Sequence, residues 1–275
     1  MPAVFADPRG VPHVPQVELG PYRLRAGGWM TLLACAGVAA FGLLGRWQWH
    51  RAAEKRALEA AFAAGALQPA SALGARSTAD LPRYSLLSLR GRYDGAHQFL
   101  LDNMGHDGAT GYEVLTPLLL EDGRMLLVNR GWLPLPGGRR DRLPAIALPA
   151  GSTAQPGAAA PASGAVATIE ISGRIDLLPV AAIRMGHAAP SPGPDWPKRT
   201  SFPTTPELAA ALARPIEPRQ LLLAASEPDG FARDWKPAGE GFGPARHLAY
   251  ALQWWAFAAL ALFLYLFLNI ERREP

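Results

Sequence analysis

The chain has 275 residues, of which 49% are hydrophobic and 18% are charged, and its formal net charge at pH 7 is +4. This hydrophobic content excludes a disordered chain, and the small net charge argues against a strongly basic nucleic-acid-binding protein. The only cysteine is Cys35. A single cysteine excludes a disulfide framework and a metal site built from several thiolates.

The first long apolar run covers residues 26–45, which are 20 uncharged residues between Arg25 and Arg46. The apolar core of a signal peptide usually has about 7–15 residues and precedes a small-x-small cleavage site. This run is longer, and no such site follows it. We therefore favour an uncleaved transmembrane helix over residues 26–48, preceded by a cytoplasmic tail over residues 1–25, with a signal peptide as the alternative.

Residues 46–64 consist mainly of strong helix formers. We expect the first helix to continue through them, beyond the membrane. Arg51, Lys55 and Arg56 would then form either a solvated face beside the lipid headgroups or a docking surface for a partner protein.

Beyond residue 80, short apolar runs alternate with Gly, Pro and Asp, which is typical of strands and turns. We predict an antiparallel meander of strands, and three further elements complete the domain. The strands cover residues 84–93, 98–103, 112–120 and 125–132; the later elements are strands over 168–175 and 220–225 and a short helix over 206–213. Residues 150–165 are uncharged and rich in Ala, Gly and Pro, which predicts a flexible insertion.

The second apolar run covers residues 248–270, which are 23 residues without a charge. At about 1.5 Å per residue, a helix of this length spans a hydrocarbon core of roughly 30 Å. We predict a transmembrane helix over residues 247–270 and a cytoplasmic tail over 271–275. The fold class is thus α+β, with two transmembrane helices flanking one β-rich extracytoplasmic domain over residues 49–246.

The sequence has no phosphate-binding glycine loop, no Gly-x-Ser-x-Gly motif and no closely spaced histidine pair. We therefore expect a protein that is not an enzyme. His247, Tyr250 and Trp254 stand at i, i+3 and i+7 and so share one face of the second membrane helix. A neutral imidazole at the start of that helix either anchors it in the interface or binds a metal or a porphyrin iron.

Three separated stretches resemble motifs of the Surfeit-one (Shy-type) family, membrane proteins that assist the assembly of haem-copper cytochrome oxidase. The first is the Gly-x-Trp-Gln-x-x-Arg-x-x-x-Lys pattern over residues 45–55. The second comprises residues 111–118 (GYEVLTPL) and 128–134 (VNRGWLP), and the third comprises residues 233–235 (RDW) and 244–254 (PARHLAYALQW). The order of the motifs and the two-span architecture also match, so the resemblance covers most of residues 25–270.

The resemblance implies an assembly factor in a bacterial inner membrane, with both termini in the cytoplasm and the β-rich domain in the periplasm. Its partners would be the large subunit of cytochrome c oxidase and other assembly factors, and its cofactor would be haem a. The expected haem site has His247 as the iron ligand, with Tyr250, Trp254, Arg246 and Arg130 around it. The residues expected to bind partners are Trp47, Gln48, Arg51, Lys55 and Trp132.

Two alternatives stay open at this point. Arg130, at the end of an apolar strand, suits a structural ion pair or a cation–π contact as well as a haem propionate. The whole chain could also serve as a cofactor-free structural protein of the respiratory chain. Whether the purified protein carries a haem pigment distinguishes these two functions.

Overall fold

The computed structural model describes residues 17–19, 22–24, 27–138, 141–150, 152, 168–180, 188–237 and 242–272. The fold is α+β, with a large sheet and two long apolar helices. The chain divides into a helical unit, Met1–Ala57 with Gly241–Pro275, and a β-rich unit, Leu58–Glu240, which we treat separately. Most of the expected tail over 1–25, nearly all of the expected insertion over 150–165 and residues 273–275 lie outside the described residues.

Two helices, α1 (Gly28–Leu67) and α3 (Pro244–Asn269), are long and apolar enough to cross a membrane. Only 6% of the apolar window of each helix is buried, whereas the core helix of a soluble protein is mostly buried. The helix α1 is continuous over 40 residues, or about 60 Å. The prediction that the first helix continues beyond its apolar run is therefore confirmed.

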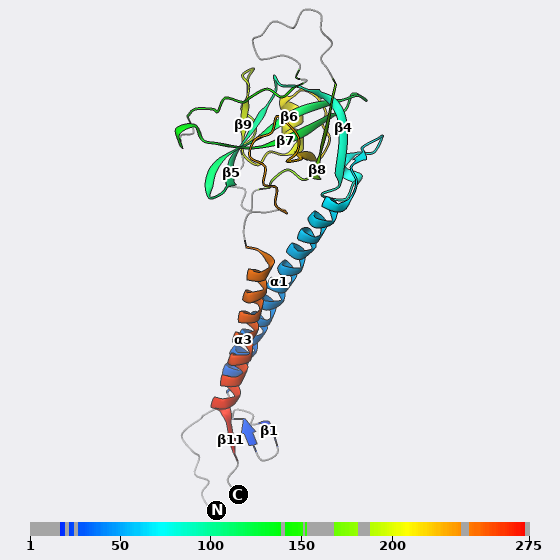
Figure 1. Cartoon of the computed structure of the whole chain (residues 1–275). Helices are drawn as coiled ribbons and strands as arrows, with labels where there is room; N and C mark the ends of the chain where they lie inside the picture. The colour runs from blue at the N-terminus through cyan, green and yellow to red at the C-terminus, as the bar shows by residue number, and fades with distance from the viewer. Residues whose placement is uncertain are drawn as a thin grey trace, which may run out of the picture. The chain divides into compact units, whose positions relative to one another are not determined.

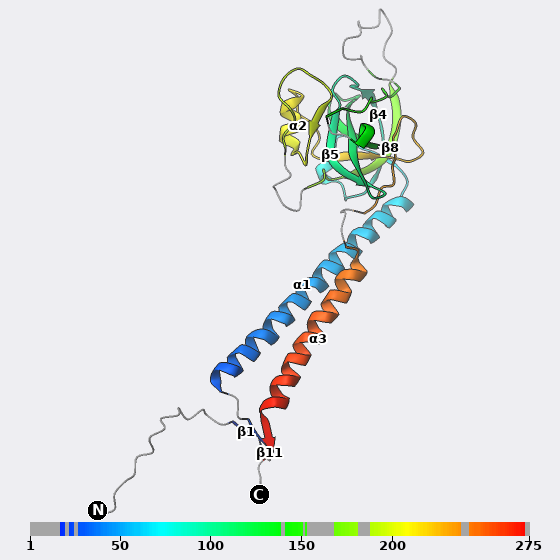
Figure 2. The same ribbon diagram turned by 90° about the vertical axis from the view of Figure 1, so that its left-hand side faces the viewer.

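The helices α1 and α3 lie side by side and pack through one stripe of each, which we call the helix seam (Figures 1 and 2). Its more buried positions recur in steps of three and four, the 3.5-residue period of left-handed helix pairs. The seam residues are Thr31, Ala34, Val38, Phe41, Gly45, Gln48 and Ala52 of α1 and His247, Ala251, Trp254, Ala258, Ala261 and Tyr265 of α3. The hydroxyls of Thr31 and Tyr265 lie 2.7 Å apart at one end of this seam.

Three short strands join the segments outside the two helices: β1 (Val17–Leu19), β2 (Tyr22–Leu24) and β11 (Ile270–Arg272). The central strand β2 pairs antiparallel with both β1 and β11. The segment before α1 and the segment after α3 therefore meet at the same end of the helix pair. We expected only tails there, and strand pairing between segments so distant in sequence has no local signature.

The β-rich unit contains an eight-stranded sheet in the order β3-β4-β8-β10-β7-β6-β5-β9. Figure 1 labels β4 to β9 of this sheet. Its strands are β3 (Ser71–Ala72), β4 (Leu86–Tyr93), β5 (Phe99–His106), β6 (Ala109–Leu120), β7 (Met125–Pro134), β8 (Ile169–Asp176), β9 (Lys198–Thr200) and β10 (Gln220–Leu223). Two 3-10 turns, η1 (Thr78–Asp80) and η2 (Pro136–Gly138), lie in the connections.

An additional pairing between β4 and β6 closes five of these strands, β4-β8-β10-β7-β6, into a ring, which we call the barrel. The long strand β6 makes this possible, because its first half pairs with β5 and its end pairs with β4. Gly91 of β4 lies where the ring closes, and a Cβ there would be 2.5 Å from the carbonyl oxygen of Leu119. A glycine at this position therefore allows the close approach of the two backbones.

The prediction of a simple antiparallel meander is wrong for part of the sheet. The strands β5, β6 and β7 do follow one another as antiparallel neighbours. The strand β4, however, pairs with β3, β6 and β8, and β7 pairs in parallel with β10. These pairings join segments far apart in the chain and depend on the closed ring, which alternation within one strand does not encode.

Side chains from all five strands of the ring fill its interior with a hydrophobic cluster that includes Leu89, Leu118, Val128, Ile171 and Leu221. Alternate residues of each strand point inward, as in other small barrels. A second cluster lies between β5, β6 and the helix α2 (Thr205–Ala211), which Figure 2 shows beside the barrel. A capping box formed by Thr204 and Glu207 starts α2, close to the expected helix over 206–213.

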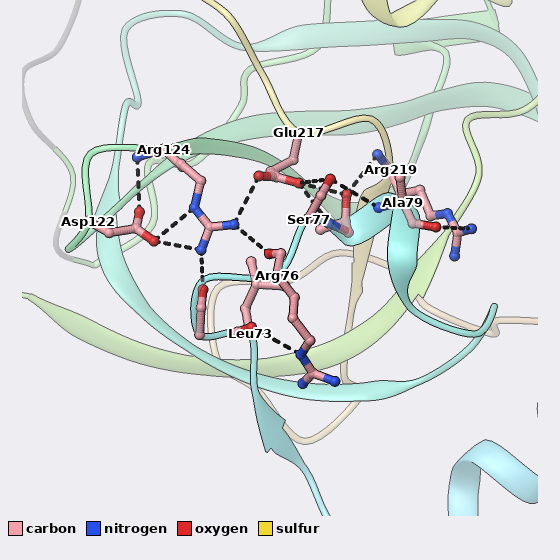
Figure 3. A network of polar contacts seen from close by, with 10 residues as sticks. Leu73, Arg76, Ser77, Ala79, Asp122, Arg124, Glu217 and Arg219 are labelled. Carbon is pink, nitrogen blue, oxygen red and sulfur yellow. Dashed lines mark hydrogen bonds and ion pairs between the residues drawn. The ribbon is translucent and has the colours of Figure 1, made fainter.

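A polar network joins three connections at one end of the barrel (Figure 3). The guanidinium of Arg124 bridges the carboxylates of Asp122 and Glu217 and also donates to the carbonyl oxygen of Arg76 at 2.6 Å. Glu217 in turn accepts hydrogen bonds from the segment that contains η1. The network therefore ties these three connections to one another through charge-assisted hydrogen bonds.

Candidate functional site

His247 lies in the first turn of α3, which begins with Gly243 as N-cap and Pro244 as first helical residue. Pro is favoured at that position because it has no N–H to satisfy. The imidazole is half-buried in the helix seam, and its Nδ1 lies 2.7 Å from Oε1 of Gln48 on α1. Within the described parts of the chain, no hydrogen bond involves Nε2 of this imidazole.

Phe242 provides the aromatic surroundings of this histidine. Its ring lies 6.3 Å from the imidazole of His247 and 6.1 Å from the ring of Tyr250, measured between centroids. The guanidinium of Arg246 lies over the same ring at 4.4 Å. Phe242 therefore joins three of the residues expected in the haem site, but the sequence prediction did not include it because it precedes the helix and its periodicity.

The other aromatic residue expected in the site, Trp254, is positioned by α1. Its ring stacks on Phe41 with 5.8 Å between centroids and an interplanar angle of 19°. Its neighbour Trp255 lies against Gly45, where a Cβ would require the indole to move, and 5.9 Å from the ring of Trp49. The sequence predicted that His247, Tyr250 and Trp254 share one face of the helix. In the structure His247 and Trp254 lie in the helix seam, while Tyr250 lies beside it.

Four of the residues expected to bind partners lie on α1, where they fall into two groups. Trp47 is 55% exposed, and Arg51 is exposed in an ion pair with Glu54 at 2.8 Å. Lys55 is half-buried. These three remain compatible with a solvated face or a docking surface. Gln48, in contrast, is directed into the helix seam toward α3.

Arg130 lies in the β-rich unit, with 1% of its surface exposed. Its guanidinium donates to the carbonyl oxygens of Asp229 and Ala147 and to Oε1 of Gln98, and it lies 4.8 Å from the Phe231 ring. Burial lowers the pKa of this side chain to about 10. The cation–π alternative is thus present, and an enclosed guanidinium with four of its five N–H groups engaged gives no support to the propionate role.

Trp132, the last residue expected to bind a partner, packs within the β-rich unit. Its indole N–H donates to the carbonyl oxygen of Met104 at 2.9 Å, and its backbone N–H donates to Ala232 at 2.8 Å. Arg233 and Trp235, which belong to the third sequence motif, also make hydrogen bonds within this unit. The Arg233 side chain donates to the carbonyl oxygen of Ala224, and the Trp235 indole donates to that of Leu223. The second motif and residues 233–235 of the third motif therefore lie together within the β-rich unit.

The donor set at His247 suits an iron already held by a macrocycle, not a bare ion. Among the described residues, no group of three His, Cys, Asp or Glu side chains could hold a metal ion. A haem iron, however, needs only one or two axial ligands from the protein, because the porphyrin supplies four nitrogens. One half-buried imidazole among aromatic rings fits that requirement.

Comparison with protein families gives one match. A family model described as "SURF1 family" matches residues 35–259, which run from within α1 through the β-rich unit and into α3. All three of the sequence motifs lie inside these bounds. No curated protein matches the chain.

Proposed function

The chain belongs to the SURF1 family, a family of cytochrome c oxidase assembly factors, and we propose that it serves this assembly by holding haem a for the large oxidase subunit. Assembly factors of this kind act by binding, so the absence of a nucleophile motif in the sequence is in keeping with the family. We further propose that the protein resides in a bacterial inner membrane, with its β-rich unit in the periplasm and both termini in the cytoplasm. Its partners there are the large subunit and other assembly factors.

The observation that best supports the haem proposal is the hydrogen bonding of the two ring nitrogens of His247. Its Nδ1 is engaged by Gln48, whereas Nε2 makes no hydrogen bond with the described residues. When bound, haem a would supply the iron and its porphyrin nitrogens, and His247 would hold that iron through an imidazole nitrogen. An imidazole nitrogen that no described residue engages, at the start of an apolar helix, is suited to that role.

The neighbouring side chains have distinct parts in this proposal. Phe242 and Tyr250 offer aromatic surface to the apolar macrocycle. Arg246 offers a cation to a propionate, with which a guanidinium forms charge-assisted hydrogen bonds. Trp254 and Phe41 stabilise the helix pair behind the imidazole and exclude water from the seam.

A cofactor-free scaffold is the second candidate, and the exposed residues on α1 favour it. Trp47 is exposed beyond the apolar run, and Arg51 is exposed nearby. An exposed tryptophan beside a cation is a common feature of protein interfaces. This surface could bind the oxidase subunit whether or not haem is present.

Bound pigment tests the haem proposal. The full chain is co-expressed with a haem a biosynthetic pathway and purified in detergent, as wild type and as His247→Ala. We expect a haem spectrum from the wild-type protein and a lower occupancy or a shifted Soret band from His247→Ala. His50→Ala is the matched control, because this exposed histidine near the start of the motif contacts only Arg46, at 3.4 Å, among the hydrogen bonds of the described residues.

Two results would decide against haem binding at His247. A colourless wild-type protein from membranes that demonstrably contain haem a favours the cofactor-free scaffold. Equal haem loss in His50→Ala and His247→Ala removes the specific role of His247.

A further inference from the structure

We infer that Gln48 is a positioning residue for His247: it holds the imidazole in the tautomer whose Nε2 lone pair can bind haem iron. This inference rests on the proposed haem site. It assigns to Gln48 a role inside the protein, in place of the partner-binding role expected from its motif.

The orientation of the Gln48 amide decides which imidazole nitrogen carries the proton. Oε1 of Gln48 lies 2.7 Å from Nδ1 of His247, and an amide oxygen can only accept a hydrogen bond. With the amide in this orientation, Nδ1 carries the proton. In a neutral imidazole the other nitrogen, Nε2, then has its lone pair free.

The helix seam explains why Gln48 can hold this position. One turn before it, Gly45 is fully buried beneath Trp255, and a Cβ at Gly45 would collide with the indole. Two turns before it, Phe41 stacks on Trp254. These contacts fix the register of α1 against α3 on one side of the Gln48–His247 pair. Both side chains are half-buried there, where low polarity strengthens a hydrogen bond.

A second-shell acceptor of this kind has two effects on a ligating histidine. It restricts the rotation of the imidazole ring. It also raises the basicity of the ligating nitrogen, because it accepts a hydrogen bond from the N–H of the other ring nitrogen. Loss of such a partner typically lowers metal affinity by about 10–100-fold. The opposite orientation of the amide would place its NH₂ against Nδ1 and move the proton to Nε2, which would block ligation.

The tautomer can be measured without haem. The full chain is produced with ¹⁵N-labelled histidine in detergent micelles, and the imidazole signals of His247 are assigned by their loss in His247→Ala. We expect the Nδ1–H tautomer in the wild-type protein and a substantial Nε2–H population in Gln48→Leu. A wild-type imidazole in the Nε2–H form would overturn the inference directly, whatever the haem content.

Haem affinity provides the second measurement. Purified protein without haem is titrated with haem a in detergent, and binding is followed by the Soret band. We expect Gln48→Leu to weaken binding about 10–100-fold, and Gln48→Glu, which keeps an acceptor oxygen, to bind far more tightly than Gln48→Leu. Gln253→Leu is the matched control, because Gln253 is an exposed glutamine on α3, and its affinity should equal that of wild type.

The two measurements separate the failure of this inference from the failure of the haem proposal. If His247→Ala loses haem but Gln48→Leu binds it as tightly as wild type, Gln48 is not a positioning residue and the haem site stands. If neither wild type nor any variant binds haem, the proposed function fails. The tautomer then still decides whether Gln48 controls the protonation of His247.

Discussion

At the scale of single residues, Glu217 shows how the barrel fixes its connections. Its carboxylate accepts hydrogen bonds from Ser77 Oγ, from the Thr78 backbone and hydroxyl, and from Arg124, at 2.8–3.1 Å. The Glu217 side chain is 8% exposed. Burial alone would raise the pKa of this carboxyl group, but the hydrogen bonds together outweigh that effect and lower it below its ordinary value.

The lowered pKa predicts how stability depends on pH. A carboxyl group whose pKa is lower in the folded state stabilises the fold fully above its unfolded pKa, and this contribution is lost as the pH falls through the folded pKa. Glu217→Gln removes the charge and replaces one acceptor oxygen by a donor, so we expect a loss of about 1–3 kcal/mol at pH 7. The difference from wild type should begin to shrink as the pH falls below the ordinary pKa of an unfolded glutamate, about 4.3, and should disappear once the pH is below the lowered pKa of the folded state.

Thermal unfolding of the full chain in detergent, at several pH values, checks this prediction. Glu121→Gln is the matched control: its carboxylate is 56% exposed and 3.9 Å from Arg90, so the effect of this substitution should be small at every pH. A stability gap for Glu217→Gln that does not change between pH 7 and pH 3 would show that the charge of Glu217 is not responsible.

At the scale of elements, the packing of α1 on α3 depends on one small residue. Gly45 and Gly42 lie one turn apart on the same helix, but their surroundings differ. A Cβ at Gly45 would collide with the indole of Trp255, whereas a Cβ at Gly42 would meet no atom within 4 Å. Small residues at such positions allow two membrane helices to approach closely.

This contrast predicts opposite outcomes for two equivalent substitutions. Gly45→Leu should separate the helices or displace Trp255, and overpacking of this kind costs about 1–3 kcal/mol. Gly42→Leu should leave stability unchanged or slightly increased, because leucine has the higher helix propensity by up to about 1 kcal/mol. Thermal unfolding followed by tryptophan fluorescence in detergent compares the two. Equal stability of both variants would mean that the Trp255 contact does not hold the helices together.

At the scale of the whole molecule, the two long helices and the strands outside them bear on the proposed arrangement in the membrane. Each of α1 and α3 is long and apolar enough for one crossing. The strands β2 and β11 pair, so the segments before α1 and after α3 meet at one end of the helix pair. If each of these two described helices crosses the membrane once, both termini lie on the same side, and the pairing of the outer segments is in keeping with that.

Reporter fusions test this arrangement in cells. We expect a reporter fused after Pro275 to indicate the cytoplasm, and one inserted at Ala158, between the two helices in sequence, to indicate the periplasm. Large loops translocate largely regardless of their charge, so the nearly even distribution of positive charges around the spans does not oppose this expectation. The two-span topology would be wrong if both reporters gave the same compartment.

The sequence by itself determined the long elements of this protein, because their signals are local, whereas the short strands β1, β2, β3, β9 and β11 were not predicted. The uncharged runs predicted both long helices, and alternating short apolar runs predicted β4 to β8 and β10 to within a few residues. The turn between β5 and β6 followed from Asp107 and Gly108, which adopt φ values of 47° and 78°, as tight hairpins require. The position of His247 at the start of α3 was likewise predicted from helix periodicity and the family resemblance.

Only the tertiary structure decided which of these elements meet. The closure of β4 on β6 and the parallel pairing of β7 with β10 involve strand edges, and any strand pattern presents two similar edges to many partners. Gln48 and His247 are 199 positions apart, and no local pattern links a polar residue on one helix to a particular histidine on another. The burial of Arg130 was also undetermined, since alternation places a side chain on one face of a strand but does not say what covers that face.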